Sequence, residues 1–455
     1  MKLDKLILSN FRGFDQLEIE FDPQLTVIAG VNGSGKSSIL QAIRHIASYS
    51  IKDISDSQEP AIKCKSSDVK QGKGAFSISV EFRGSIMGVD SQIVRALPNK
   101  AKLKIIREKF EKFKSEISST KKGSSELLEI KNELLTLNQL VKEQEDHFTT
   151  QWLRLNPKKE PDFDDPIFVF YSTQRTYKNL TNTPRALKPL APSNAYVNAL
   201  QAERVSLYDA ALWLKVAESG LLSDYSASHN YKKLLEETIH AILPEFSDIK
   251  FHDSSPPRFS VLKNEERFNL SILSDGEKSL LALAIDLTRR LSLANPEKEN
   301  PVTEGCAVVL IDEIELHLHP KWQRQVLRRL TKTFKNCQFI VTTHSPQVIG
   351  QTSAEKLRLL YSDKGGKIIS KTPSQSKGMD SSWILQNIMG CPARDYEIER
   401  KLSKIFDLID DDQILDAKKA VESLELEIGI FPELQEAISL VDRLEMLAED
   451  NEIDS

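Results

Sequence analysis

The stretch Gly30-Val-Asn-Gly-Ser-Gly-Lys-Ser37 decides the fold. It matches the pattern G-x-x-x-x-G-K-S of a loop that wraps around phosphate groups. An apolar run, residues 25–29, leads into the loop, and the amphipathic residues 37–46 follow it. The loop therefore connects an expected strand to an expected helix. Its glycines allow a close backbone approach to phosphates, and the helix adds the positive end of its dipole.

Side chains of this loop supply the other contacts to a triphosphate. Lys36 can reach the β- and γ-phosphates, and the Ser37 hydroxyl can hold Mg²⁺. We expect a nucleotide to contact Gly30, Asn32, Gly33, Ser34, Gly35, Lys36, Ser37 and Ser38. The alternative, a glycine turn that happens to contain a lysine, leaves the flanking strand and helix unexplained.

Composition restricts the class of protein. The chain has 455 residues, which predicts two or three domains, and 40% hydrophobic with 28% charged residues is typical of a soluble protein. It contains no apolar run near the roughly 20 residues that span a membrane and no secretory leader, so we expect a cytoplasmic protein. The four cysteines are scattered without metal-binding spacing. The net charge of −5 does not indicate a nucleic-acid binder, although local patches remain compatible with it.

Apolar and alternating segments predict a sheet around the loop, with parallel strands joined by right-handed helical crossovers. Residues 258–272 are expected to form a hairpin, and helices are expected at residues 198–243 and 321–334. The expected strands are residues 2–9, 17–21, 25–29, 76–82, 167–172, 307–311 and 338–342.

Residues 100–155 have a different pattern. Apolar residues recur three and four positions apart in two runs, separated by the polar segment 120–125, which predicts a short antiparallel helical hairpin. A solvated face of a structural hairpin and a nucleic-acid contact both explain the charges of its first arm. The basic residues of this arm are Lys100, Lys102, Lys104, Arg107, Lys109, Lys112 and Lys114.

These patterns divide the chain into four segments. Residues 1–98 are an N-terminal lobe with the phosphate loop, and residues 99–156 are the inserted hairpin. Residues 157–362 complete the nucleotide-binding head. Residues 363–455 form a helical region with amphipathic helices expected at 393–424 and 433–447, which is available for binding a partner.

Two carboxylates follow the apolar strand 308–311. Asp312 lies at the carboxyl end of this strand, beside the phosphate loop, where it can fix Mg²⁺ through water. Glu313 is placed to polarise the attacking water. The sequence therefore predicts a nucleoside triphosphatase site with Glu313 as its base.

Three further segments extend this site. Gln174, after the strand ending at Ser172, is expected to bridge Mg²⁺ and the water, and His344, after a buried strand, to sense the γ-phosphate. Residues 273–279 open a helix with a positive end, where we expect Ser274, Gly276 and Glu277 to contact a nucleotide. Since the phosphate loop already provides one such end, the second is best explained as serving a nucleotide on another copy of the chain.

The order of the phosphate loop, Gln174, residues 273–279, Asp312-Glu313 and His344 resembles that in ABC-type ATPases. The segment Leu8-Ser-Asn-Phe-Arg-Gly-Phe14 looks like the first strand of the SMC, Rad50 and RecF branch, which implies that Arg12 touches a nucleotide phosphate. Asp275 departs from the glycine of many ABC proteins.

The segments Asp312-Glu-Ile-Glu-Leu-His-Leu-His-Pro320 and Thr343-His-Ser-Pro-Gln-Val348 resemble OLD-family ATPases. His317 and His319 belong to that pattern, so we interpret them as structural or interfacial. Tyr171-Ser-Thr-Gln-Arg-Thr176 and residues 380–390 are similar to the PtuA family, the ATPases of Septu antiphage systems that also occur with some retrons. OLD proteins continue into a Toprim nuclease, whereas the acids at 410–412 lack its pattern, so we expect no nuclease in this chain.

The resemblance implies an ABC-type ATPase that uses ATP and Mg²⁺, pairs around nucleotide and controls an HNH-type nuclease. The alternative is a DNA-repair or recombination ATPase of the Rad50 or RecF type, which the basic hairpin arm favours. A transporter subunit is disfavoured by the inserted hairpin and by the long separation between Lys36 and Ser274. A nucleotide-gated scaffold with little turnover is disfavoured by Glu313.

Overall fold

The structure is a computed structural model, and it describes residues 2–54, 66–73, 75–83, 91–96, 167–175, 192–201, 231–252, 258–363, 365–392 and 394–453, with a few isolated positions between them. The chain divides into two compact units, residues 1–379 and residues 380–455. The expected hairpin at 99–156 lies outside the described residues. Among the described helices, none combines the length and the apolar content needed to cross a bilayer.

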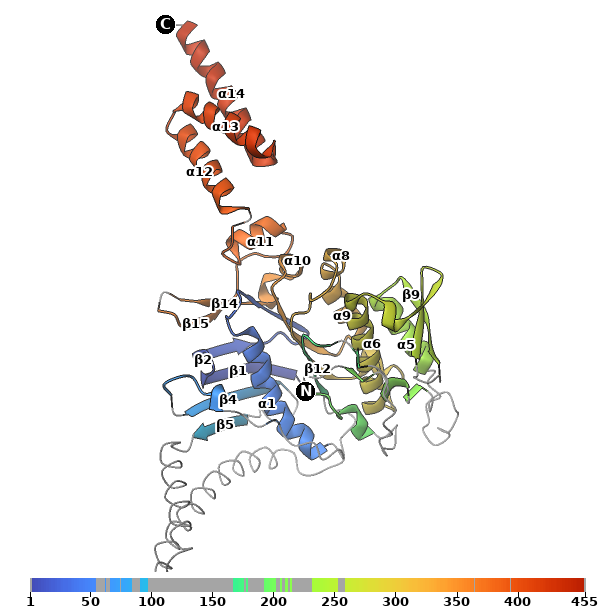
Figure 1. Ribbon diagram of the computed structural model, residues 1–455. Helices are drawn as coiled ribbons and strands as arrows, with labels where there is room; N and C mark the ends of the chain where they lie inside the picture. The colour runs from blue at the N-terminus through green and yellow to red at the C-terminus, as the bar shows by residue number, and fades with distance from the viewer. Residues whose placement is uncertain are drawn as a thin grey trace, which may run out of the picture. The chain divides into compact units, whose positions relative to one another are not determined.

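A six-stranded sheet forms the centre of the first unit (Figure 1). Five of its strands are parallel, and β15 joins the edge in the antiparallel sense. The inner strands are apolar and fully buried, because helices and a second sheet cover both faces. The strand order is β15 (Ile368–Lys371), β14 (Leu357–Ser362), β3 (Leu25–Gly30), β13 (Gln338–Thr343), β12 (Ala307–Ile311) and β6 (Ile167–Tyr171).

An antiparallel sheet packs beside it. The buried Gln338 amide joins the two sheets: its Oε1 accepts from the Leu3 N–H at 2.8 Å, and its Nε2 donates to the Leu3 carbonyl at 2.7 Å. Helix α1 (Lys36–Ile54) contacts strands of both sheets. This second sheet has the order β2 (Phe14–Glu20), β1 (Lys2–Phe11), β4 (Ala75–Arg83) and β5 (Ser91–Ala96).

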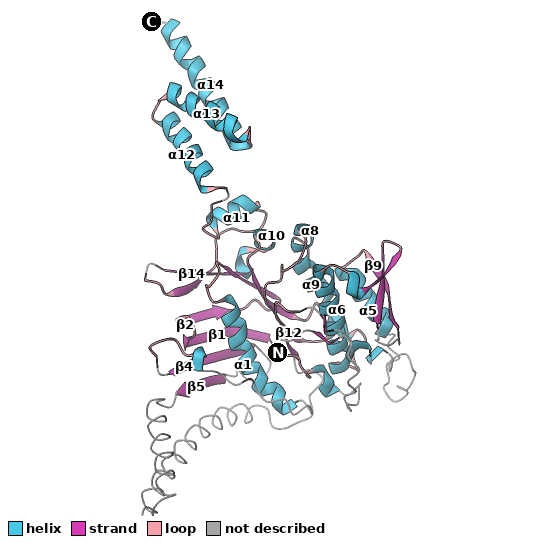
Figure 2. Ribbon diagram, in the orientation of Figure 1, coloured by secondary structure: helices cyan, strands magenta, loops and turns pink. Residues whose placement is uncertain are grey.

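The other side of the first unit is helical, with a small antiparallel sheet (Figure 2). Helix α6 (Asp275–Ala294) is almost completely buried and packs against α5 (Tyr231–Ile242). The small sheet contains β9 (Phe246–His252), β10 (Arg258–Lys263) and β11 (Glu266–Asn269), and β10–β11 is the hairpin expected from sequence. Short elements are β7 (Tyr177–Lys178), β8 (Val205–Ser206), α7 (Pro301–Glu304), α10 (Pro346–Ile349) and the 3₁₀ turns 66–68, 192–195, 270–272 and 354–356.

The expected helix at 321–334 is confirmed in part, because the structure divides this range into two helices, α8 (Pro320–Gln323) and α9 (Val326–Thr333). At Gln325 the backbone φ is −116°, and the Gln325 N–H donates to the carbonyl of Trp322, three residues earlier. Of the expected helical stretch 198–243, the structure describes α5 and leaves most of the remainder outside the described residues.

The second unit consists of α11 (Ser381–Asn387), α12 (Tyr396–Asp410), α13 (Ile414–Ile428) and α14 (Pro432–Ile453). The single helix expected at 393–424 is therefore wrong. Three aspartates at positions 410–412 oppose the negative end of the α12 dipole, and Asp412 takes a left-handed φ of +55°. Helices α12, α13 and α14 share one core, formed by Ile405, Ile409, Ala417, Val421, Leu424, Leu434, Ala437 and Val441.

The first unit ends later than the expected boundary at residue 363. Strand β14 pairs with β3 of the central sheet, and β15 pairs with β14, so residues up to 379 belong to the first unit. These two strands, together with β5 and β9, were not predicted from the sequence.

Candidate functional site

The phosphate loop connects β3 to α1, as its sequence predicts. Gly35 has a left-handed φ of +93°, and a Cβ at this position would lie 2.5 Å from the Phe14 ring. The buried Lys36 bends back into the loop, and its Nζ donates to the carbonyls of Gly30 and Val31, each at 2.9 Å. Burial lowers the pKa of Lys36, while Glu313, Asp312 and Glu315 oppose this shift. The loop therefore holds one cation at the position where phosphate oxygens are expected.

Ser37 and Asp312 meet at the carboxyl edge of the sheet. The Ser37 hydroxyl donates to Asp312 Oδ1 at 3.0 Å, and the Thr342 hydroxyl donates to the same oxygen at 2.6 Å. A hydroxyl and a carboxylate oxygen are ligands that Mg²⁺ accepts, together with phosphate oxygens and water. The pair therefore fits the magnesium site expected from sequence.

Glu313 follows β12 in a left-handed conformation, with φ +48°. Its N–H donates to the Thr342 hydroxyl at 2.8 Å, so β13 fixes the backbone of the residue. A non-glycine residue with this φ stores strain that its neighbours must compensate. The geometry holds the Glu313 backbone rigidly beside the magnesium pair, as a catalytic base requires.

Arg175 is a site residue that the sequence analysis missed. It is only 2% exposed, and its guanidinium donates to the carbonyls of Asp312 at 2.7 Å, Glu313 at 2.8 Å and Ile314 at 3.1 Å. Burial lowers its pKa to about 10, against the attraction of Glu315, Asp312 and Glu313. Arg175 thereby fixes the loop that carries both carboxylates.

His344 lies at the end of β13, on the same edge of the sheet. The backbone N–H of His344 donates to Glu315 Oε1 at 2.5 Å, and the neighbouring Thr343 hydroxyl donates to Glu315 Oε2 at 2.8 Å. Burial lowers the pKa of His344, Lys36 lowers it further, and the three nearby carboxylates oppose this shift. The imidazole is therefore biased toward its neutral form, in which one nitrogen donates and the other accepts a hydrogen bond.

Two other predicted residues lie at the border of the site. Arg12 donates from Nε to Asp68 at 3.0 Å and from Nη1 to Ser38 Oγ at 3.4 Å, so it reaches the end of the phosphate loop. Gln174 is exposed, and its N–H donates to Ser172 Oγ at 3.1 Å. It directly precedes Arg175 in the chain.

The predicted residues of the second anion site lie at the beginning of α6. Ser274 caps this helix in a reciprocal capping box with Glu277, and Lys263 pairs with Glu277 at 2.5 Å. The Glu277 carboxylate is thus occupied within its own chain. A Cβ on Gly276 would lie 2.3 Å from the carbonyl oxygen of His317, so only glycine fits against this loop. Ser274 and Asp275 remain exposed.

The two histidines of the loop after Glu313 have structural roles here. His317 adopts φ +62° and presents its carbonyl to Gly276, and His319 Nδ1 accepts from the Lys321 N–H at 3.2 Å as the cap of α8. No group of three or more metal-ligating His, Cys, Asp or Glu side chains occurs among the described residues.

Comparisons with known proteins show which family the chain belongs to. A family model described as "AAA domain, putative AbiEii toxin, Type IV TA system" matches residues 25–350. The chain is 32% identical to the retron Ec83 probable ATPase of Escherichia coli over 420 residues, which cover 85% of this chain and 76% of that protein. It is 38% identical to the Septu protein PtuA of Bacillus mycoides (strain KBAB4) over 118 residues, which cover 26% of this chain and 16% of that protein.

A solved structure of an SMC head bound to the C-winged helix domain of ScpA aligns with 82% of this chain and 98% of that chain, at 17% identity and a TM-score of 0.43. The family model and the relatives identify the chain as an ABC-type ATPase of the SMC, Rad50 and OLD branch. More particularly, the chain belongs to the AAA family with the putative AbiEii toxin description, and it is related to the retron Ec83 probable ATPase along most of its length.

Proposed function

We propose that this ATPase binds ATP with Mg²⁺ between two copies of the chain and uses hydrolysis to control a separate nuclease in antiphage defence. The carrying observation is the beginning of α6, where Ser274 is exposed and makes its hydrogen bonds to Glu277 of the same helix, which leaves this helix end open to a second copy. Ile272 beside it is 68% exposed, and Val31 in the phosphate loop is 46% exposed. Pairing two copies would cover both apolar side chains.

Within the pair, each residue has a distinct task. Lys36 and the loop N–H groups neutralise the phosphates, with Arg12 at the end of the loop. Ser37, Asp312 and Gln174 would hold Mg²⁺, which supplies charge neutralisation at the β- and γ-phosphates. The Glu313 carboxylate accepts the proton of the attacking water, and neutral His344 hydrogen-bonds the γ-phosphate. Ser274 and Gly276 of the second copy close the site over the same phosphate.

The partner is inferred from the relatives. Proteins similar to this chain carry the names of a retron ATPase and a Septu PtuA protein, and the PtuA resemblance implies an HNH-type nuclease as a second subunit. We place the protein in the cytoplasm, where that subunit would act on nucleic acid. Co-expression with an HNH nuclease encoded beside this gene tests the partnership: the two are expected to co-purify, and separate elution contradicts it.

The Glu313→Gln variant tests the pairing. Loss of the general base should lower kcat by at least about a hundredfold while ATP still binds. In mass photometry with ATP and Mg²⁺, we expect this variant to accumulate a species of twice the 51.4 kDa chain mass. Lys36→Ala is the control and is expected not to pair. Wild-type hydrolysis by Glu313→Gln would show that the base is assigned wrongly.

A further inference from the structure

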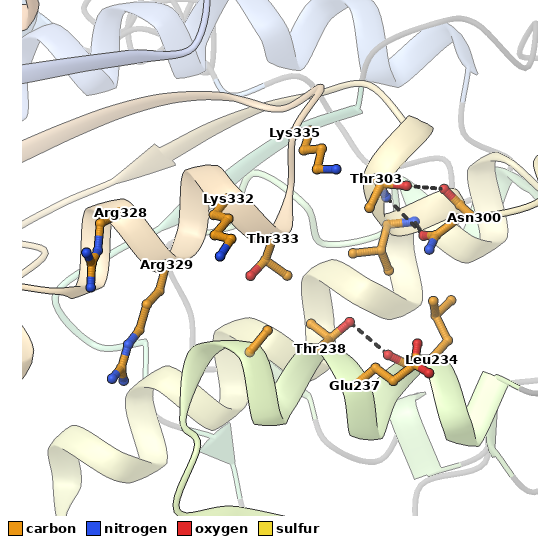
Figure 3. Close-up of a pocket in the computed structure, with 12 residues that line it drawn as sticks. Leu234, Glu237, Thr238, Asn300, Thr303, Arg328, Arg329, Lys332, Thr333 and Lys335 are labelled. Carbon is orange, nitrogen blue, oxygen red and sulfur yellow. Dashed lines mark hydrogen bonds between the residues drawn. The ribbon is translucent and has the colours of Figure 1, made fainter.

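Helix α9 separates two cavities of the first unit. The first, of about 610 Å³, lies between α9, α5 and the beginning of α7 (Figure 3). The second, of about 550 Å³, lies between α9 and the segment that contains α10 and residues 351–356. Both cavities are lined by Arg328, so they meet at this side chain.

Nearly all the charged side chains that line the two cavities are basic. Together these side chains form what we name the α9 basic track: Arg324, Arg328, Arg329, Lys332, Lys335, Lys356 and Lys377. The one acidic residue among the lining residues of the two cavities is Glu237, which itself pairs with Lys233 at 3.8 Å. Such a concentration of one sign stands out in a chain whose net charge is −5.

Most of these cations are free to bind a ligand. Arg329 is the exception, because its Nη1 donates to the Ile242 carbonyl at 2.8 Å and joins α9 to α5. Within the described part of the chain, the other six side chains form no hydrogen bond and no ion pair, and five of them are exposed. Glu355 acts on Lys356 and Glu245 acts on Arg329 as nearby opposite charges. The other cations of the track lie close to one another and repel, so an anion would relieve an electrostatic cost.

The spacing along α9 suits a linear polyanion. Arg328 and Lys332 lie four positions apart on one side of α9, and Lys335 follows just after the helix ends at Thr333. Figure 3 shows Lys332 directed toward the space above α5. The rise of 1.5 Å per residue separates Arg328 and Lys332 by about 6 Å along the axis, a distance of the same order as the phosphate spacing of a nucleic-acid strand. The second cavity continues the row through Arg324, Lys356 and Lys377.

We infer that the α9 basic track binds the phosphate backbone of a nucleic-acid strand. Two cavities meeting at Arg328 extend beyond what a single small phosphate compound needs, which favours a strand. Among the described residues that line them there is no aromatic side chain on which a base could stack. The contact is therefore to phosphates, independent of base sequence and strongly dependent on salt. This site goes beyond the proposed function, which requires only ATP and protein partners.

The test measures how a fluorescein-labelled single nucleic-acid strand of mixed sequence binds to the full chain. Fluorescence anisotropy gives the affinity at each of a series of NaCl concentrations. For Arg328→Ala/Lys332→Ala/Lys335→Ala we expect the slope of log K against log salt to become shallower by about 2 and the affinity to fall at least about tenfold. Arg324→Ala/Lys356→Ala/Lys377→Ala should have the same effect. Arg400→Ala/Lys404→Ala/Arg443→Ala, which removes three exposed cations from the second unit, should leave binding unchanged.

Several results would overturn the inference. Unchanged affinity in both track variants would do so, as would a loss confined to the hairpin variant Lys102→Ala/Lys104→Ala/Lys109→Ala/Lys112→Ala. An effect of the first triple variant alone would reduce the track to a site for a small anion. Binding of poly-glutamate without binding of the strand would identify an acidic protein as the occupant. ATP-dependent pairing, measured in the same variants, is expected to persist, which separates this failure from failure of the proposed function.

Discussion

Arg175 connects two segments that are far apart in the sequence. It lies 137 residues before Asp312, yet its guanidinium holds the backbone carbonyls of the loop that carries Asp312 and Glu313. A buried arginine with carbonyl acceptors is rigid, and its removal leaves these acceptors unpaired. Arg175 therefore acts as a positioning residue for Glu313.

Arg175→Gln should lower kcat roughly ten- to hundredfold, because a shift of about 1 Å in a catalytic group has effects of this size. The KM for ATP is expected to stay within about twofold, since the phosphate loop is untouched. Steady-state ATPase kinetics give both values. Arg358→Gln is a matched control, because Arg358 also donates to backbone carbonyls but lies away from the site. Equal losses in both variants would reduce Arg175 to a structural role.

At this scale, local motifs were sufficient for Lys36, Ser37, Asp312, Glu313 and His344, which the structure brings to one edge of the sheet. Arg175, Thr342 and Glu315 were missed because their roles depend on long-range contacts. The sequence contained one indication of the role of Arg175: it is a charged residue close after a buried strand and directly after Gln174, an expected ligand. Only the fold shows which carbonyls it meets.

Helix α6 transmits a packing requirement to the loop after Glu313. Gly276 lets the first turn of α6 approach the His317 carbonyl, and the added Cβ of alanine would lie 2.3 Å from that oxygen. Neither atom belongs to a flexible side chain, so the backbone itself would have to move.

Gly276→Ala should therefore destabilise the first unit by about 1–3 kcal/mol and also lower ATPase activity, since α6 and the catalytic loop shift together. Chemical denaturation followed by circular dichroism measures the first effect. In Gly365→Ala the new Cβ meets only the Asp363 carboxylate, at 3.3 Å, and a smaller change is expected. Wild-type stability of Gly276→Ala would show that the contact is not tight.

Helix α1 contains a buried titratable group, His45, which is 4% exposed. Burial lowers its pKa, Arg12 and Arg44 act in the same direction, and the Ile62 carbonyl and Asp68 oppose the shift. The unfolded chain therefore takes up a proton near pH 6.5 that the folded protein refuses.

The free energy of unfolding should then fall as the pH decreases below about 6.5, by up to about 1.4 kcal/mol per pH unit from this group. Denaturant titrations at several pH values measure the slope. His45→Gln is expected to flatten it, whereas His240→Gln, at an exposed position on α5, is expected to leave it unchanged. A slope unaffected by His45→Gln would contradict the assignment.

Elements with strong apolar patterns were predicted well, including β3, β6, β12 and β13, because strands buried on both faces are continuous apolar runs. Errors fell where backbone geometry, and not hydrophobicity, ends an element. The apolar period continues through Gln325, although the chain breaks its helix there. At residues 410–412 three aspartates and the left-handed Asp412 end α12. Strands β14 and β15 alternate weakly at the sheet edge, where tertiary pairing decides their conformation.

At the scale of the whole molecule, each unit has its own core. The second unit packs α12, α13 and α14 together, and the ion pairs Lys401–Glu427 and Lys418–Glu445 link neighbouring helices. The sequence predicted the helical class of this region but not its boundary, since the β14–β15 pairing joins residues 363–379 to the central sheet. At this scale, the proposed ATPase function depends on the pairing of two chains around ATP.

The most direct test of that proposal mixes two inactive variants. Lys36→Ala removes the cation of the phosphate loop, and Ser274→Arg blocks the beginning of α6. Thermal unfolding is used to check that each variant is folded. When they carry different tags and are purified together, the phosphate loop of one copy faces the intact α6 of the other. We predict that each variant alone has background ATPase activity, that Ser271→Arg remains active, and that the mixed complex regains hydrolysis. A mixed complex no more active than its separate parts, or full activity of Ser274→Arg alone, would contradict an ATP site shared between two chains.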